Sequence, residues 1–400
     1  MQLGSLLPIR CALALFFLHT ATLDVLLPPC PPECICLSQS QVLCNSGGLR
    51  EIPKKLLPPT VEHLSLTRNH FPLIKSDSFA GLRYLRKLSL DGNNISTIKP
   101  FAFRGLPRLR ELSIQHTPLQ TVAQFAFAGL QNITIINLSN NRIRRVEGYA
   151  FAGTTNLRFL LLANNPLHIL ESRSFSGLTN VEKITFPSGI RSIERSAFEG
   201  LDTIGHIKLA FMDLPGMRPG MFRGLTNVGL LAVQESDLGI IDGAAFDEMT
   251  NVAVLHVLNN KIDAIEYLNL TSEQHIGRLE VRGNHILEIP KAETLIVEVE
   301  TLTVISNHFP CNCHIHSLLE GPLANGSRTH FITNNFCISP LEVNGLPMTS
   351  LDIDAIGRCE EEVTKENLEA TKDASDSFSI RREARFMLVF VLVIVTVVQR

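Results

Sequence analysis

The sequence predicts a repeat protein of the α/β type, folded as a curved solenoid with one long parallel sheet. Two regularities carry this prediction. Apolar residues return in one phase, in the pattern L-x-x-L-x-L-x-x-N-x-L, between residues 61 and 309. Downstream of each pattern stands a phenylalanine, and these residues are 24 apart with one step of 23: Phe79, Phe103, Phe127, Phe151, Phe175, Phe198, Phe222 and Phe246.

The pattern occurs eleven times, and the unit with Leu85, Leu88, Leu90, Asn93 and Ile95 shows it in full. Alternating leucines make a short strand with one buried face, and asparagine can hold the following turn by bonding neighbouring backbone. One unit cannot bury its apolar face, so the units must stack, with their strands on the concave face and their phenylalanines along the outer side. The period and signature are those of a leucine-rich repeat horseshoe of about eleven 24-residue repeats.

Some units depart from the pattern. The asparagine of the turn is replaced by Thr117, Met212 and Ser236 in units three, seven and eight, and unit six is one residue short around residues 187–190. Threonine and serine can bond the backbone weakly, whereas methionine cannot. Two interpretations stay open: a local change of curvature in the middle of the array, or drift that the repeats tolerate.

Residues 1–22 are predicted to be a secretory signal peptide. Arg10 precedes an apolar run from Cys11 to Leu18, and small residues follow at 20–22. The run is much shorter than the roughly 20 residues needed to span a membrane. Of nine cysteines, removal of Cys11 leaves eight, in two groups of four that flank the repeats.

Each group of four cysteines is expected to staple a cap, one in residues 30–60 and one in 310–359, because a solenoid's end units would otherwise expose their core. The sequence alone allows three disulfide pairings in each group.

The caps carry a resemblance to a known family. CPPECIC from Cys30, with Cys44 after it, is similar to the N-terminal cap of extracellular leucine-rich repeat proteins such as Slit and the Nogo receptor; PCNC at 310–313, CISPLEVNG at 337–345 and Cys359 resemble their C-terminal cap. The usual tryptophans of that cap are missing, and Phe309 stands in the nearest place. The resemblance implies the pairs Cys30–Cys36, Cys34–Cys44, Cys311–Cys337 and Cys313–Cys359.

A metal site is the alternative interpretation of Cys311, Cys313, His314 and His316, since thiolate and imidazole ligands suit zinc. Two further cysteines at cap spacing favour disulfides, and no metal or cofactor is expected. No grouping of nucleophile, base and orienting residue suggests an enzyme. A formal net charge of -3 without a basic block gives no reason to expect nucleic acid.

The C-terminal segment predicts a membrane tether. Residues 360–385 are a polar linker, and residues 386–400 hold an apolar run of thirteen, about 20 Å as a helix, against a hydrocarbon core near 30 Å. A glycosylphosphatidylinositol signal fits better than a short span, with attachment among Asp373, Ala374 and Ser375. A short transmembrane segment, and secretion after loss of the tail, remain alternatives.

Five Asn-x-Ser/Thr sequons predict glycans on an extracellular chain: Asn94, Asn132, Asn137, Asn269 and Asn325.

The third, fifth and seventh positions of each unit point away from the core, and from unit four onward many are apolar. An exposed apolar patch usually marks a partner site, although small apolar residues also merely suit a sheet. We therefore expect a cell-surface receptor or adhesion molecule for an extracellular protein ligand or co-receptor; a soluble or matrix-bound scaffold is the alternative, and a homodimer is also considered. The expected ligand-binding residues are Ile135, Phe159, Leu161, His206, Lys208, Leu230, Val254, His256 and Leu258.

Overall fold

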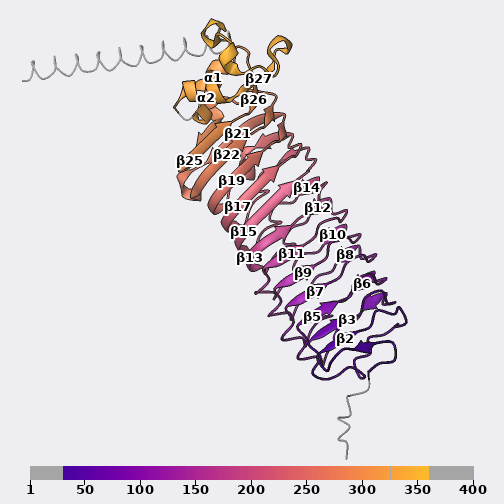
Figure 1. Ribbon diagram of the computed structural model, residues 1–400. Coiled ribbons are helices and arrows are strands. Elements are labelled where there is room, and N and C mark those ends of the chain that lie inside the picture. The colour runs from indigo at the N-terminus through magenta and orange to yellow at the C-terminus, as the bar shows by residue number, and fades with distance from the viewer. Residues whose placement is uncertain (1–29, 325, 360–400) are drawn as a thin grey trace, which may run out of the picture.

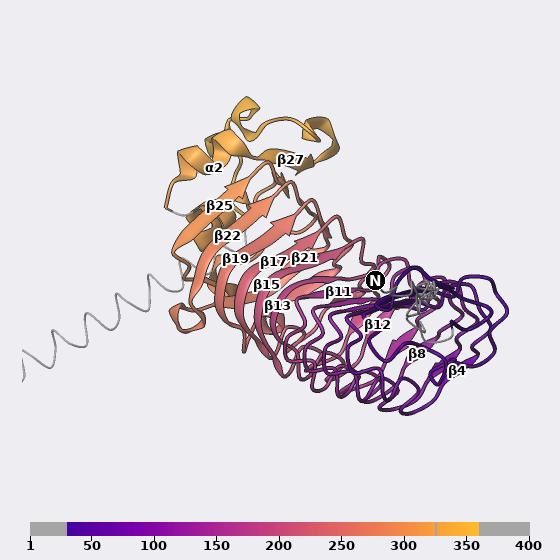
Figure 2. The same cartoon turned by 60° about the horizontal axis from the view of Figure 1, so that its bottom comes forward.

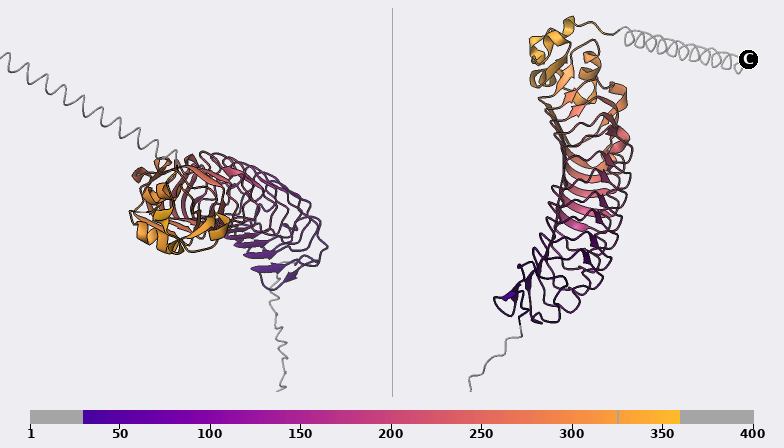
Figure 3. Two further views of the ribbon diagram at one scale, coloured as in Figure 1. Left: turned by 90° about the horizontal axis from the view of Figure 1, so that it is seen from above. Right: turned by 90° about the vertical axis from the view of Figure 1, so that its right-hand side faces the viewer.

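The computed structural model describes residues 30–324 and 326–359, and it confirms a curved solenoid with one strand of the main sheet in each turn (Figure 1). The expected signal peptide, linker and tail, together with Asn325, lie outside the described residues. The two cysteine-rich caps stand at opposite ends of the solenoid (Figure 3). Among the described residues, no helix has the length and apolarity needed to cross a membrane.

The main sheet has thirteen strands, of which eleven are the strands of the eleven predicted units. Neighbouring strands pair in parallel throughout, except that β1 runs antiparallel to β2. The two extra strands come from the N-terminal cap. In order across the sheet the strands are β1 (Ile35–Cys36), β2 (Gln41–Leu43), β3 (His63–Ser65), β5 (Lys87–Ser89), β7 (Glu111–Ser113), β9 (Ile135–Asn137), β11 (Phe159–Leu161), β13 (Thr179–Thr185), β15 (Leu201–Ala210), β17 (Leu225–Gln234), β19 (Thr250–Leu258), β22 (Ile276–Arg282) and β25 (Thr301–Ile305).

The strands of the main sheet lengthen from three residues in β11 to ten in β15 and β17, and they shorten again to five in β25 (Figure 2). One position of the unit, the residue after its first apolar position, shows how closely the longer strands approach one another. A side chain at Gly205 or Gly229 would place its Cβ only 2.6 Å from a carbonyl oxygen of the preceding strand. Glycine leaves room for this close approach in β15 and β17, whereas β13 carries Glu182 and β19 carries Ala253 at the same position, so the longer strands do not depend on glycine alone.

Short strands and turns form the other sides of the solenoid. They pair across repeats in separate sheets of two or four strands, and further backbone hydrogen bonds, such as that from the amide of Phe101 to the carbonyl of Phe125, also join neighbouring turns. The strands are β4 (Leu73–Ile74), β6 (Thr97–Ile98), β8 (Thr121–Val122), β10 (Arg145–Val146), β12 (Ile169–Leu170), β14 (Ser192–Ile193), β16 (Gly216–Met217), β18 (Ile240–Asp242), β20 (Lys261–Ile262), β21 (Ala264–Leu270), β23 (His285–Ile286), β24 (Leu295–Val297), β26 (His308–Pro310) and β27 (Phe336–Ser339). The 3-10 turns span Gly243–Ala245, Ser272–Gln274, Ala292–Thr294, Pro322–Ala324, Leu341–Val343, Met348–Ser350 and Ile353–Ala355.

The eight repeated phenylalanines are buried and stack in one continuous column. Consecutive rings are 5.3 to 6.4 Å apart and nearly parallel. At the short sixth unit, Phe186 inserts edge-on beside Phe175 and Phe198, at 5.4 and 6.3 Å. The extra ring fills the core where the repeat has lost a residue, so the column passes through the irregular unit.

The buried asparagines of the repeated turns form a ladder of hydrogen bonds, the asparagine ladder, which joins successive repeats. Asn284 shows its full form: it is buried, donates to the carbonyl of Val257 at 2.8 Å, and accepts from the amide of Asn260 at 2.9 Å. The departures keep these bonds by other means. Thr117 donates to Asn141, and the Ser236 hydroxyl accepts from the amide of Met212, whose own side chain is simply buried.

Each cap is joined to the adjacent repeat by the same kind of asparagine hydrogen bond that links the repeats to one another. At the N-terminal end the amide of Leu49 donates to Asn69 of the first repeat, and at the C-terminal end Asn307 donates to Asn335. Asn335 follows α2 (Arg328–Asn334), which with α1 (Ile315–Glu320) closes the core. The ladder thus extends one step past the last repeat.

All four disulfides have the pairing that the resemblance implies, Cys30–Cys36, Cys34–Cys44, Cys311–Cys337 and Cys313–Cys359. Cys311 is bonded to Cys337 and Cys313 to Cys359, so neither offers a free thiolate to a metal near His314 and His316.

Candidate functional site: the concave sheet

The register of the main sheet arranges its outward side chains in straight rows, because equivalent residues of successive strands are direct partners. Ile135 is paired with Phe159, and His206, Leu230 and Val254 follow in the same row. The next row holds Leu161, Lys208 and His256, and Leu258 lies in a third row opposite Gln234. All nine expected residues therefore lie on one face of the sheet.

The structure divides these residues into two apolar groups. The first consists of Ile135, Phe159 and Leu161 on β9 and β11; the second consists of Leu230, Val254 and Leu258 on β17 and β19. Every member is half-buried, so each presents part of its apolar surface to solvent.

Two strands with basic side chains separate the apolar groups. β13 carries Lys183, and β15 carries His206 and Lys208; all three are exposed. Within the described chain, none of these three side chains forms an ion pair. We call Lys183, His206 and Lys208 the central basic stripe. Lys183 is missing from the residues expected from the sequence, although it occupies the same outward position as Phe159 one repeat earlier.

The two ends of the concave face are already paired internally. At the N-terminal end, Lys87 and Glu111 form an ion pair at 2.6 Å, and Asp91 accepts from the Ser113 hydroxyl at 2.8 Å. At the C-terminal end, Glu280 lies 3.3 Å from the ring of His256. Groups that already bond one another gain less from a ligand, so the middle of the sheet has the greatest unused capacity for polar contacts.

The sequons lie in different surroundings. Asn132 is exposed, whereas Asn94, Asn137 and Asn269 are half-buried. Asn137 sits on β9 within the concave face, next to the first apolar group. A glycan on Asn137 would border that group on its N-terminal side, and glycosylation of each sequon stays a prediction.

The Asn269 sequon adjoins the half-buried carboxyl of Asp247. Burial raises the pKa of Asp247, and a hydrogen bond from Asn269 acts in the opposite direction. A glycan on Asn269 would therefore modify the same amide that hydrogen-bonds to the Asp247 carboxyl.

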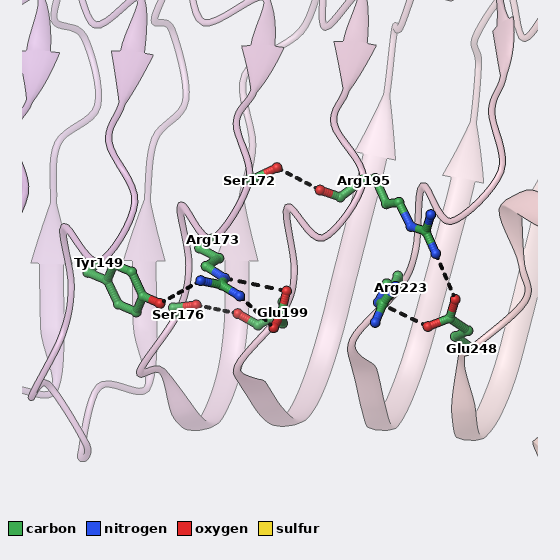
Figure 4. Close-up of polar contacts among 8 residues, drawn as sticks. All are labelled: Tyr149, Ser172, Arg173, Ser176, Arg195, Glu199, Arg223 and Glu248. Atoms are coloured by element: carbon green, nitrogen blue, oxygen red, sulfur yellow. Dashed lines mark hydrogen bonds and ion pairs between the residues drawn. The ribbon is translucent and has the colours of Figure 1, made fainter.

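A polar network on the loops outside the concave face links neighbouring repeats, and one of its ion pairs reaches across a whole repeat (Figure 4). Arg173 donates to the Tyr149 hydroxyl and to Glu199, both at 3.2 Å, and Glu248 pairs with Arg223 at 2.9 Å and Arg195 at 3.3 Å. The hydrogen bond from Arg173 lowers the pKa of the Glu199 carboxyl. The partners stand more than twenty residues apart, so sequence reasoning missed the network; its contacts stabilise the loops rather than form a pocket.

These features define a class: a solenoid protein with disulfide-bonded caps at both ends and an open concave sheet. The chain belongs to the leucine-rich repeat family. Residues 59–119 and 107–167 match the family described as leucine rich repeat, and residues 146–272 match the BspA type leucine rich repeat region.

Known proteins support the same fold. A segment of 61 residues is 39% identical to mouse chondroadherin-like protein and a similar one is 38% identical to the human protein; each covers 15% of this chain and 8% of the relative. A chain of the mouse RP105/MD-1 complex has a TM-score of 0.51 at 20% identity, over 78% of this chain and 53% of that one. A chain of the octameric complex of latrophilin 3, Unc5D and FLRT2 has a TM-score of 0.52 at 21% identity, over 81% and 98%.

Proposed function

We propose that this protein is an extracellular, membrane-tethered receptor or adhesion molecule that binds a protein ligand through the concave sheet. The observation that carries the proposal is the central basic stripe lying between two half-exposed apolar groups on one face. This arrangement offers apolar surface for burial together with charges that have no partner in the described chain.

The sheet is suited to binding because it is already ordered. Its strands are paired in register from β2 to β25, so a ligand would not have to order the backbone that it contacts. The half-buried Phe159 is the largest apolar side chain in the site, and burial of an aromatic anchor at the centre of an interface commonly dominates its energetics.

The disulfides support the extracellular placement. Four disulfides form and persist in oxidising compartments such as the secretory pathway. The two structural neighbours were solved in complexes with other proteins, which is in keeping with a protein ligand here.

Tethering is proposed from the predicted lipid-attachment signal at residues 373–375. Phosphatidylinositol-specific phospholipase should release the protein from cells, and the released protein should lack a peptide from residues 386–398. Surface protein that keeps its C-terminus and resists the phospholipase would instead indicate a transmembrane segment. Protein found only in the medium or matrix would favour the scaffold alternative.

The concave site is tested by a double variant, Phe159→Asp with Leu161→Ser. A partner is first cross-linked to the full chain on cells, identified and purified, and its affinity is then measured for each variant. The double variant should be secreted normally but lose binding, because it places a charge and a hydroxyl in the first apolar group. Lys87→Ala on the N-terminal part of the sheet and Ile240→Asp on β18 are the controls and should bind like the parent. Equal binding by the double variant and the parent would rule out this part of the sheet.

A further inference from the structure

An arginine-rich groove lies outside the concave site, at the N-terminal ends of β5, β7, β9 and β11. It has a volume of about 670 Å³ and is lined by Arg86, Arg108, Arg110, Asn132, Asn156 and Arg158, with threonine, proline and a further asparagine completing the wall. No carboxylate lines it. The groove therefore gathers four positive charges in a protein whose formal net charge is -3.

The backbone fixes the spacing of the arginines along the solenoid. The amide of Arg110 donates to the carbonyl of Arg86 at 2.8 Å, Thr134 donates to Arg110 at 2.8 Å, and Arg158 donates to Thr134 at 2.9 Å. Each step is one strand of the sheet, about 4.8 Å, so the three arginines of this ladder span on the order of 14 Å. The charges form a line rather than a single point site.

The central charges of the groove are available to a ligand. At its two ends, Arg86 pairs with Glu62 at 3.4 Å and Arg158 pairs with Glu182. Arg108 lies 4.8 Å from the ring centroid of Tyr84, which holds its side chain without neutralising it. Among the described residues, Arg110 forms no ion pair.

We infer that this groove binds a sulfated polysaccharide chain, as a function separate from protein binding on the concave face. A guanidinium group donates two parallel hydrogen bonds to an oxyanion such as sulfate, and a line of arginines matches an extended ligand that carries sulfate groups at intervals. Asparagine and threonine between the arginines offer donors and acceptors for sugar hydroxyls. The groove has no apolar pocket of the kind that seats the side chains of a bound peptide, which favours a polysaccharide over an acidic peptide.

The Asn132 sequon stands inside the same groove. Its amide donates to the carbonyl of Pro107 at 2.7 Å, and the side chain is exposed. A glycan on Asn132 would emerge through the groove and compete for its space, so occupancy of this sequon would limit access to the arginines.

The test measures binding of a heparin octasaccharide to the full chain over a series of salt concentrations. Arg108→Ala with Arg110→Ala should weaken binding by about tenfold or more for each arginine, since each loses a charge-assisted hydrogen bond. The slope of log affinity against log salt should fall by about two. The matched control is Arg142→Ala with Arg144→Ala, which removes the same charge from exposed positions before β10 and should bind like the parent.

A further comparison decides the ligand class. Unsulfated hyaluronan and polyglutamate of similar length should bind much more weakly than the heparin octasaccharide. Equal losses in both arginine pairs would show a general charge effect and overturn the assignment of the ligand to this groove. Equal affinity for polyglutamate would overturn the choice of a polysaccharide.

Discussion

Asn284 shows how much a single repeated side chain contributes to this fold. It is fully buried and satisfies the carbonyl of Val257 and the amide of Asn260, two backbone groups of the preceding repeat. A buried polar group left without a partner costs more than the average hydrogen bond contributes.

Asn284→Ala should therefore lower the free energy of unfolding by about 2 to 4 kcal/mol, because both backbone groups lose their partner. Thermal unfolding followed by circular dichroism measures the loss. Asn156→Ala removes an exposed amide bonded to the Gln131 carbonyl, which water can replace, and should change stability little. Similar melting temperatures for the two variants would show that the ladder is not a major source of stability.

His308 should give the stability of the C-terminal junction a dependence on pH. Its ring stacks between His285 at 4.5 Å and Phe336 at 5.2 Å, and its Nδ1 is buried without a hydrogen-bond partner in the described residues. Burial, and next the positive charge that His285 can carry, lower the pKa of His308 below its ordinary value of 6.5.

The sign of the pH effect follows from proton binding. Below the ordinary pKa the unfolded chain takes up a proton that folded His308 resists, so stability falls as pH decreases from about 6.5 towards the lowered pKa. His308→Phe keeps an aromatic ring in the stack and should reduce this loss of stability. Denaturant unfolding at several pH values between 7.5 and 5 provides the comparison. An unchanged pH dependence in His308→Phe would assign the effect to another group.

At the scale of elements, the caps close the solenoid by both covalent and noncovalent means. The Cys313–Cys359 bond closes a loop of 46 residues, whereas Cys30–Cys36 closes one of 6. On the chain-entropy view of disulfides, the longer loop restricts the unfolded chain more.

Cys313→Ser with Cys359→Ser should therefore destabilise the protein by about 2 kcal/mol more than Cys30→Ser with Cys36→Ser. The double substitutions leave no unpaired thiol from the broken bond. Secreted yield and melting temperature report the effect. A larger loss from the N-terminal pair would mean that local strand packing around β1, rather than loop closure, decides the contribution of each staple.

The sequence was sufficient to predict the regular elements. The apolar positions of the repeat are buried except Val299 and Leu302 of the last unit, which are half-buried, the eleven units form eleven strands, and the cap resemblance implied the four disulfides. It did not predict the lengthening of the strands after β11. The longer strands include close backbone approaches such as those at Gly205 and Gly229, and such distances arise only when the repeats stack.

The candidate site was predictable in part. The outward positions follow from the two-residue period of a strand, so the rows of Phe159 and Leu161 could be named in advance. The division of these outward residues into two apolar groups was not predicted, because it depends on which residues lie on the strands between them. Lys183 separates the apolar groups only because its strand lies next to β11, and the groove at Arg110 is made by loop residues outside the repeated apolar pattern.

At the scale of the whole molecule, the solenoid separates its surfaces. The concave sheet carries the proposed protein site, and the loops that lead into its strands carry the arginine groove. The outer loops are joined by ion pairs such as that of Arg173 with Glu199. The central claim is that the ligand occupies the middle of the concave sheet.

The most direct measurement of this claim places a glycan there. Lys183→Asn creates the sequon Asn-Ile-Thr in the central basic stripe, and Glu194→Asn creates Asn-Arg-Ser on an exposed loop next to β14 as the control. Both variants are secreted, a mass shift on deglycosylation confirms that each new sequon is occupied, and affinity for the purified partner is then measured. We predict that the Lys183→Asn variant loses binding and the Glu194→Asn variant keeps it; undiminished binding by the glycosylated Lys183→Asn variant would contradict a ligand on the concave sheet.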